Sequence, residues 1–84
     1  MYIGILGAGT MGNGIAHVFA QYNHKVILVD VNDDALKKAL DIIKSNLNRQ
    51  LQKKIISESD INKIMNNITT SIDINEFKNC DIVI

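Results

Sequence analysis

The stretch Gly7–Gly12, with the sequence GAGTMG, decides the fold of this chain. It follows an apolar run at residues 2–6 and opens a helical pattern that continues through residues 15–20. A strand, a glycine turn and a helix in this order open the doubly wound α/β domains. The first glycine permits a tight bend, and the third lets the helix pack closely on the strand. The flanking segments make this motif more specific than an isolated Gly-x-Gly-x-x-Gly.

A second signal lies downstream and indicates a dinucleotide ligand. The apolar run at residues 26–29 is typical of a buried parallel strand, and Asp30 follows it directly. Asp30 lies roughly 20 residues beyond the glycines, where such folds place the carboxylate that accepts hydrogen bonds from both ribose hydroxyls of NAD. The turn itself would hold the pyrophosphate, because its second glycine has no side chain and the helix directs its positive end there. The alternatives are an ordinary strand-to-helix turn for the glycines and a helix cap or solvated turn residue for Asp30.

The composition is that of one small domain without a nucleic-acid or membrane signature. The chain has 84 residues, 46% of them hydrophobic, and its nine basic and nine acidic residues give a net charge of zero. Aromatic residues make up only 5%, which argues against base-stacking platforms. No basic patch suits nucleic acid, and no apolar run approaches the length of a membrane span.

Cellular location is predicted from the N-terminal segment and from cysteine usage. The first residues carry no basic region before the apolar stretch, so we expect no standard signal peptide. The one cysteine, Cys80, cannot form an internal disulfide, and it precedes an apolar run. We expect it to be a buried, inert thiol. These features predict a soluble, cytoplasmic protein of a reducing compartment.

Helices and strands are expected to alternate along the first half of the chain. A helix is predicted from about Thr10 to Tyr22, with Asn23 in the left-handed position that ends it. Residues 25–30 form the second strand, and Asn32 caps a long helix. The apolar stripe of that helix recurs at spacings of three and four: Leu36, Leu40, Ile43, Leu47 and Leu51.

The second half of the chain continues the alternation. Residues 57–60 resemble a capping box and begin a short helix that ends at Asn66-Asn67. Residues 68–72 predict a third strand, and residues 73–78 a short helical turn that carries Phe77 inward. Residues 81–84 begin a fourth strand, which we expect to be buried. The fold class is therefore α/β, a parallel sheet of order 3-2-1-4 with its ligand at the carboxyl ends of strands 1, 2 and 4.

The string GAGTMGNGIA at residues 7–16 goes beyond the general fingerprint. It resembles the opening of the 3-hydroxyacyl-CoA dehydrogenases, especially the short-chain bacterial 3-hydroxybutyryl-CoA type. The resemblance covers the whole chain through these further segments: 29–30, 46–47, 53–54, 68–73 and 80–84. It implies a Rossmann-type domain with a pair of helices between strands 2 and 3, which residues 33–66 fit. It also implies an NAD-dependent oxidoreductase of fatty-acid or butyrate metabolism, acting at C3 of a short-chain acyl-CoA.

The resemblance implies roles for individual residues. The cofactor would contact the turn and the end of the second strand: Gly7, Ala8, Gly9, Thr10, Met11, Gly12 and Asp30. Lys53 matches a lysine that contacts CoA phosphates in relatives, and Asn46 stands near the CoA moiety where relatives often carry serine. The alternative for Lys53 is a solvated lysine at a helix C-terminus. His17 and His24 match no catalytic histidine of the family, and we expect them to be structural or solvated.

The residues that do the chemistry in the resembling enzymes belong beyond residue 84. These are a histidine held by a glutamate, with serine and asparagine nearby. The helical domain that dimerises and closes the substrate cleft also belongs there. The chain would then be the N-terminal part of the NAD-binding domain of a homodimeric parent enzyme. We expect it to hold no catalytic residue and no metal site, and to be inactive alone.

Two alternative classes are open at this stage. The β-hydroxyacid dehydrogenases share a similar turn, but theirs is typically Gly-Leu-Gly-x-Met-Gly, and an arginine for NADP commonly follows the second strand. Ala8 and the sequence Asp30-Val31-Asn32 disfavour that class. The other alternative is a non-catalytic nucleotide-binding protein that keeps only the fold.

Overall fold

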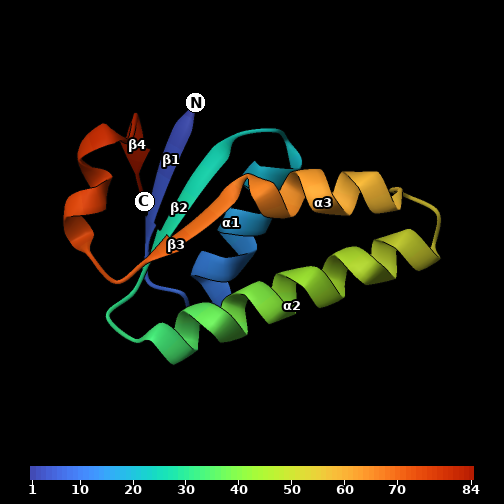
Figure 1. The fold of residues 1–84 in the computed structure, drawn as a ribbon, viewed down its shortest axis with the longest axis horizontal. Coiled ribbons are helices and arrows are strands. Elements are labelled where there is room, and N and C mark those ends of the chain that lie inside the picture. The colour runs from blue at the N-terminus through green and yellow to red at the C-terminus, as the bar shows by residue number, and fades with distance from the viewer.

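Four parallel strands form a single sheet in the order β3-β2-β1-β4 (Figure 1). The structure is a computed structural model that describes residues 1–84. The elements follow one another as β1 (Tyr2–Leu6), α1 (Thr10–Gln21), β2 (Lys25–Val29), α2 (Asp33–Gln52), α3 (Glu58–Asn66), β3 (Ile68–Ser71), the 3-10 helix η1 (Ile74–Asn79) and β4 (Ile82–Val83). The predicted fold class, the strand order and the helix pair between strands 2 and 3 are confirmed.

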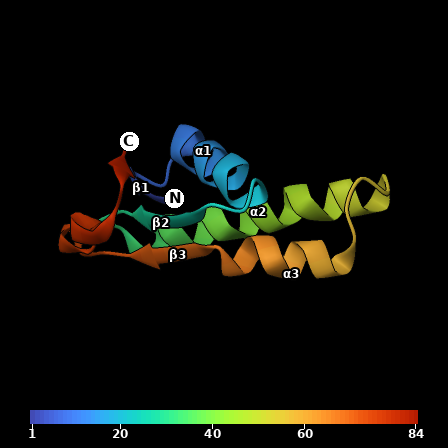
Figure 2. The same cartoon turned by 90° about the horizontal axis from the view of Figure 1, so that it is seen from above.

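One face of the sheet forms the main core with α1, α2 and α3. Alternate side chains of the central strands point to this face, including Ile3 and Ile5 of β1, and they pack in one cluster with residues of the three helices. Ala16 and Ala20 are fully buried on α1, and their small side chains let that helix lie close to the sheet. Figure 2 shows α2 and α3 lying side by side as a hairpin that extends beyond the sheet.

The predicted apolar stripe of α2 is confirmed. Leu36, Ile43 and Leu47 are buried, and Leu40 and Leu51 are partly buried against the same core. The spacing of three and four places these side chains on one side of the helix, while its charged residues remain exposed. Burial of this stripe fixes α2 against the sheet, which positions the N-terminus of α2 beside the glycine turn.

The 3-10 helix η1 packs on the opposite face of the sheet, against β1 and β2. Gly4 points to this side, where a Cβ on it would come 2.6 Å from the ring of Phe77 and 3.0 Å from Sγ of Cys80. Phe77 is therefore directed inward as predicted, and it occupies the space that a side chain at residue 4 would need. Cys80 is half-buried rather than buried. Burial, and secondarily the negative charge of Asp81, raises the pKa of its thiol, as expected for an inert cysteine.

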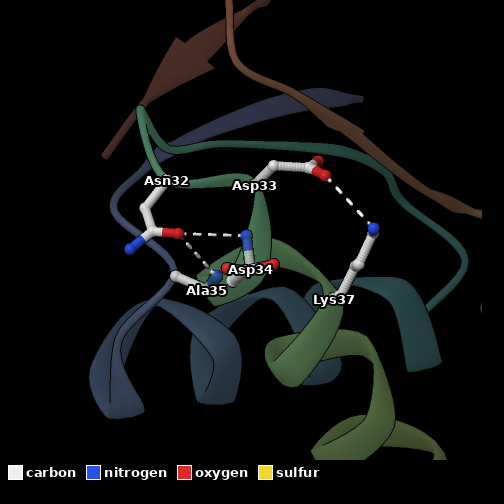
Figure 3. A network of polar contacts seen from close by, with 5 residues as sticks. All are labelled: Asn32, Asp33, Asp34, Ala35 and Lys37. Carbon is white, nitrogen blue, oxygen red and sulfur yellow. Dashed lines mark hydrogen bonds and ion pairs between the residues drawn. The ribbon is translucent and has the colours of Figure 1, made fainter.

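The helix ends follow the predicted capping chemistry. Oδ1 of Asn32 accepts hydrogen bonds from the N–H groups of Asp34 (3.0 Å) and Ala35 (3.3 Å), and Figure 3 shows this cap beside an exposed ion pair. That pair joins Asp33 and Lys37 at 3.4 Å. A full capping box begins α3, as the sequence of residues 57–60 predicts. Asn23 has a φ of 68°, the left-handed conformation expected after α1.

The strand ends differ from the predictions in two places. β3 stops at Ser71, which pairs with the last residue of β2, so Ile72 lies outside the sheet and is exposed. The expectation of a buried fourth strand is wrong, because Ile82 and Val83 are exposed. The physical reason is position: β4 lies at the edge of the sheet and pairs only with β1.

None of the helices combines the length and apolar character that a bilayer span requires.

Candidate cofactor-binding site

The glycine turn connects β1 to α1 at the carboxyl edge of the sheet. Gly7 has a φ of 96°, a left-handed conformation that favours glycine. Its N–H donates to the carbonyl of Val29 at 2.7 Å, which ties the turn to the end of β2. A side chain on Gly12 would overlap the carbonyl oxygen of Gly7. The turn and the first turn of α1 can therefore approach this closely only with glycine at residue 12.

The second glycine of the motif faces open space. Gly9 is the N-cap residue of α1, and no atom lies within 4 Å of the position that its Cβ would take. No side chain caps α1, and its first turn contains no acidic residue. The N–H groups of this first turn thus have no side-chain acceptor from the chain. These features fit a pyrophosphate approaching the backbone.

Asp30 is positioned beside this turn by two backbone donors. Its Oδ2 accepts a hydrogen bond from the N–H of Ala8 at 2.9 Å, and its Oδ1 accepts one from the N–H of Asn32 at 2.9 Å. These hydrogen bonds, the one from Ala8 first, hold the pKa of the Asp30 carboxyl below its usual range. Asp30 is therefore ionised at neutral pH. The helix-cap alternative is wrong, because Asn32 caps α2.

The structure brings residues 7–12 and Asp30 together, since the carboxyl ends of β1 and β2 are adjacent. Met11 projects from the first turn of α1 with 79% of its surface exposed, and Thr10 is exposed beside it. The resulting arrangement has backbone donors, an open approach at Gly9 and a fixed carboxylate at one edge of the sheet. It can hold an anionic group against the helix and accept hydrogen bonds from a diol.

Asn46 and Lys53 lie elsewhere, in the half of α2 that is farther from the glycine turn. They are seven residues apart, which places both on one side of the helix. Asn46 is half-buried, and Lys53 is the exposed C-cap residue. Lys53 follows 20 helical residues, so it is roughly 30 Å along the helix axis from the end that borders the turn. These two residues form a second candidate site rather than part of the first.

The two histidines make contacts away from the glycine turn. Nε2 of His17 lies 2.9 Å from Oε1 of Gln21, one helical turn later on α1. The ring of His24 packs edge-on against Phe19, with ring centroids 5.8 Å apart. Each histidine thus has a local structural partner.

Sequence reasoning missed Asn13 and Lys38. Both line a hollow of about 180 Å³ between α1 and α2, next to the glycine turn. A signal for Asn13 exists, because it precedes Ala16 and Ala20 by three and seven residues and so stands as a polar residue on the buried face of α1. Lys38 gives no such signal, since exposed lysines are common on helices.

Comparison with known proteins identifies the family. A family model described as the NAD binding domain of 3-hydroxyacyl-CoA dehydrogenase matches residues 2–84. A 3-hydroxybutyryl-CoA dehydrogenase of Bradyrhizobium diazoefficiens is 42% identical over 82 residues, which are 98% of this chain and 28% of that protein. A 3-hydroxyadipyl-CoA dehydrogenase of Escherichia coli is 32% identical over 98% of this chain and 17% of its own length. The chain thus spans less than a third of these relatives.

Solved structures agree with the sequence comparison. The crystal structure of (S)-3-hydroxybutyryl-CoA dehydrogenase from Ralstonia eutropha superimposes with a TM-score of 0.95 and 38% identity, over 98% of this chain and 29% of that one. These matches favour the 3-hydroxyacyl-CoA dehydrogenases over the β-hydroxyacid dehydrogenases. Sequence and fold therefore agree, and this chain belongs to the NAD-binding domains of the 3-hydroxyacyl-CoA dehydrogenases.

Proposed function

We propose that residues 7–12 and Asp30 bind NAD(H) and that the protein containing this domain is a 3-hydroxyacyl-CoA dehydrogenase. The observation that carries the proposal is the Asp30 carboxylate, which the N–H groups of Ala8 and Asn32 hold beside the open approach at Gly9. A ribose diol that donates to this carboxylate would place the attached diphosphate near the N-terminus of α1. The family match supports the same ligand.

In this proposal the residues of the chain bind and orient, and NAD(H) supplies the chemistry by accepting or donating hydride at C3 of the acyl-CoA. Gly7 and Gly12 set the close contact between β1 and α1 that positions the backbone donors. Asp30 fixes the adenosine end through two charge-assisted hydrogen bonds. Met11, exposed on the first turn of α1, would border the nicotinamide end.

Asp30 also predicts the choice between the two nicotinamide dinucleotides. Its carboxylate would repel a 2′-phosphate, and residues 31–34 contain no arginine or lysine to neutralise that charge. We expect the protein to prefer NADH over NADPH by at least about tenfold in kcat/KM, which corresponds to ~1.4 kcal/mol. Steady-state kinetics with both cofactors measure this ratio.

Substitution of Asp30 tests its role directly. Asp30→Asn should weaken NADH binding by at least about tenfold, the loss expected for a charge-assisted hydrogen bond. The control is Asp33→Asn, which removes an exposed negative charge from the first turn of α2. Equal use of NADH and NADPH by the unmodified protein would contradict the proposal. So would equal NADH affinities in the two variants.

The second candidate site supports an acyl-CoA substrate. Lys53 is exposed at the end of α2, and Asn46 lies two turns earlier on the same side. We propose that Lys53 binds a phosphate of CoA and that Asn46 borders the CoA moiety. Lys53→Ala should then raise KM for acetoacetyl-CoA about fivefold, as for one partly exposed charge pair, and leave KM for NADH unchanged.

Lys44→Ala is the matched control, because Lys44 is an exposed lysine on the opposite side of α2. A substrate analogue without CoA should show no difference between the unmodified protein and Lys53→Ala. If Lys53→Ala raises both KM values equally, or if Lys44→Ala has the same effect, the lysine does not serve CoA.

The proposal includes the finer properties of the parent enzyme. These are a preference for short acyl chains, a place in fatty-acid or butyrate metabolism, a homodimeric state and a cytoplasmic location. The similarity to 3-hydroxybutyryl-CoA dehydrogenases supports the short-chain preference, and the similarity to a fatty acid oxidation complex subunit supports the metabolic place. The homodimeric state and the cytoplasmic location rest on the resemblance described above. Assays with acyl-CoA substrates of increasing chain length, and sedimentation of the intact protein, test the first and third of them.

A further inference from the structure

A hollow of about 180 Å³ lies between the first turns of α1 and α2. Its volume is several times the ~30 Å³ that one water occupies in the liquid. It is lined on one side by Ala8, Gly9, Thr10 and Asn13, and on the other by Ala35, Lys38, Ala39 and Ile42. Asp30 does not line it. We call this space the Asn13–Lys38 hollow; it borders the glycine turn but is separate from the carboxylate site.

Asn13 is a buried amide without a partner. Only 6% of its surface is exposed, and its side chain makes no hydrogen bond within the chain, although buried amides usually have partners. No fully enclosed side-chain polar atom lacks a partner, so the amide of Asn13 keeps some accessible surface, at the hollow that it lines. Its neighbours on the same helical face, Ala16 and Ala20, are apolar. The amide of Asn13 is therefore available to hydrogen-bond a group that enters the hollow.

The charges around the Asn13–Lys38 hollow favour an anion. The uncapped N-terminus of α1 forms one wall. Lys38 stands on the opposite wall and forms no ion pair, and no acidic residue lines the space. Asp34 and Asp41, on neighbouring turns of α2, lie outside the lining. An ammonium, an amide N–H₂ and the free N–H groups of a helix are donors that together suit a phosphoryl group.

We propose that the Asn13–Lys38 hollow binds a phosphoryl group, with Asn13 and Lys38 as its side-chain donors. The proposal rests on the proposed function only for the source of that group. NAD(H) and CoA both carry diphosphates, and CoA carries a further phosphate. Each source predicts a different pattern of affinities, so titrations with separate probes distinguish them.

The test is calorimetric titration of the intact protein with NADH, CoA, phosphate-free pantetheine and inorganic pyrophosphate. The variants are Asn13→Ala and Lys38→Gln, and the control is Lys44→Gln, which removes the same charge from another side of α2. Each of the first two variants should lower the affinity for one phosphate-bearing ligand about tenfold, as expected for the loss of one charge-assisted hydrogen bond. The effect of Lys38→Gln should shrink as salt is raised, and pantetheine should be unaffected.

If only the affinity for NADH falls, the hollow binds a phosphate of the dinucleotide. If only the affinity for CoA falls, it binds a phosphate of the acyl carrier. Thermal unfolding separates binding from folding: Asn13→Ala should be at least as stable as the unmodified protein, because it removes a buried amide without a partner. Unchanged affinity for NADH, CoA and pyrophosphate in both variants would overturn the proposal. Equal weakening of all probes together with a lower melting temperature would also overturn it.

Titration with pyrophosphate distinguishes a failure of this proposal from a failure of the proposed function. If NADH does not bind the unmodified protein, the proposed function fails. Pyrophosphate binding that depends on Asn13 and Lys38 would still support the hollow.

Discussion

At the scale of single residues, two glycines of α1 differ in whether the structure leaves space for a side chain. A side chain on Gly12 would overlap the backbone of Gly7, whereas no atom beyond the neighbouring helix backbone lies within 4 Å of the Cβ position at Gly14. Gly12→Ala should therefore lower the free energy of unfolding by about 3 kcal/mol, because backbone atoms cannot move aside. Gly14→Ala should raise it by up to about 1 kcal/mol, because alanine favours the helix. Urea denaturation of both variants measures the difference.

The Gly12→Ala and Gly14→Ala variants together test whether the motif needs glycine at residue 12 for close packing. If Gly12→Ala were as stable as the unmodified domain, the close contact between the turn and α1 would not exist. Both glycines are visible in the sequence, but the fingerprint distinguishes them, since only Gly12 is one of its three glycines. At this scale the sequence predicts both the residue and the reason for it.

At the scale of elements, helix caps are the features that one substitution can test. Asn32→Ala should destabilise the domain by about 1 kcal/mol, because Oδ1 of Asn32 accepts hydrogen bonds from two N–H groups at the start of α2. The control is Asn48→Ala, an exposed position within α2 that should be neutral or slightly stabilising, by at most ~0.7 kcal/mol. Thermal melts report both changes, and equal melting temperatures would show that the cap does not stabilise α2.

Elements defined by local chemistry were predictable, and features set by distant neighbours were not. The spacing of Leu36, Ile43 and Leu47 predicts their buried face, and Ser57 predicts the capping box of α3. The exposure of β4 was missed although the predicted order 3-2-1-4 places that strand at an edge, because its apolar residues alone favour a buried strand. The position of Asn13 and Lys38 at one hollow was missed because α1 and α2 meet only in the folded chain.

For the whole molecule, two carboxylates predict sensitivity to acid. Backbone hydrogen bonds lower the pKa of Asp30, chiefly the one from Ala8, and lower the pKa of Asp60, chiefly the one from Ser57. In the unfolded chain both return to about 3.9. The stability that they contribute is therefore complete above that value and is lost as pH falls through it toward the lower folded values.

Unfolding followed from pH 7 to acid measures this loss. Asp60→Asn removes one of the two groups, so its stability should depend less steeply on pH below about 4. Asn62→Ala is a suitable control, because it changes an exposed side chain of the same helix that carries no titratable group. A variant Asp60→Asn with the same acid dependence as the unmodified domain would contradict the assignment.

The strand order also determines when β1 acquires its two neighbouring strands during synthesis. β1 emerges first from the ribosome, but one of its neighbours, β2, begins at Lys25 and the other, β4, begins at Ile82. At 5–20 residues per second, roughly 3 to 11 s separate the synthesis of these two partners. During that interval the strand at the middle of the finished sheet has one edge unpaired, and such an edge can join another chain. Of the four strands, the one made first is thus among the last to have both edges paired, and one of its edges is available to other chains throughout this interval.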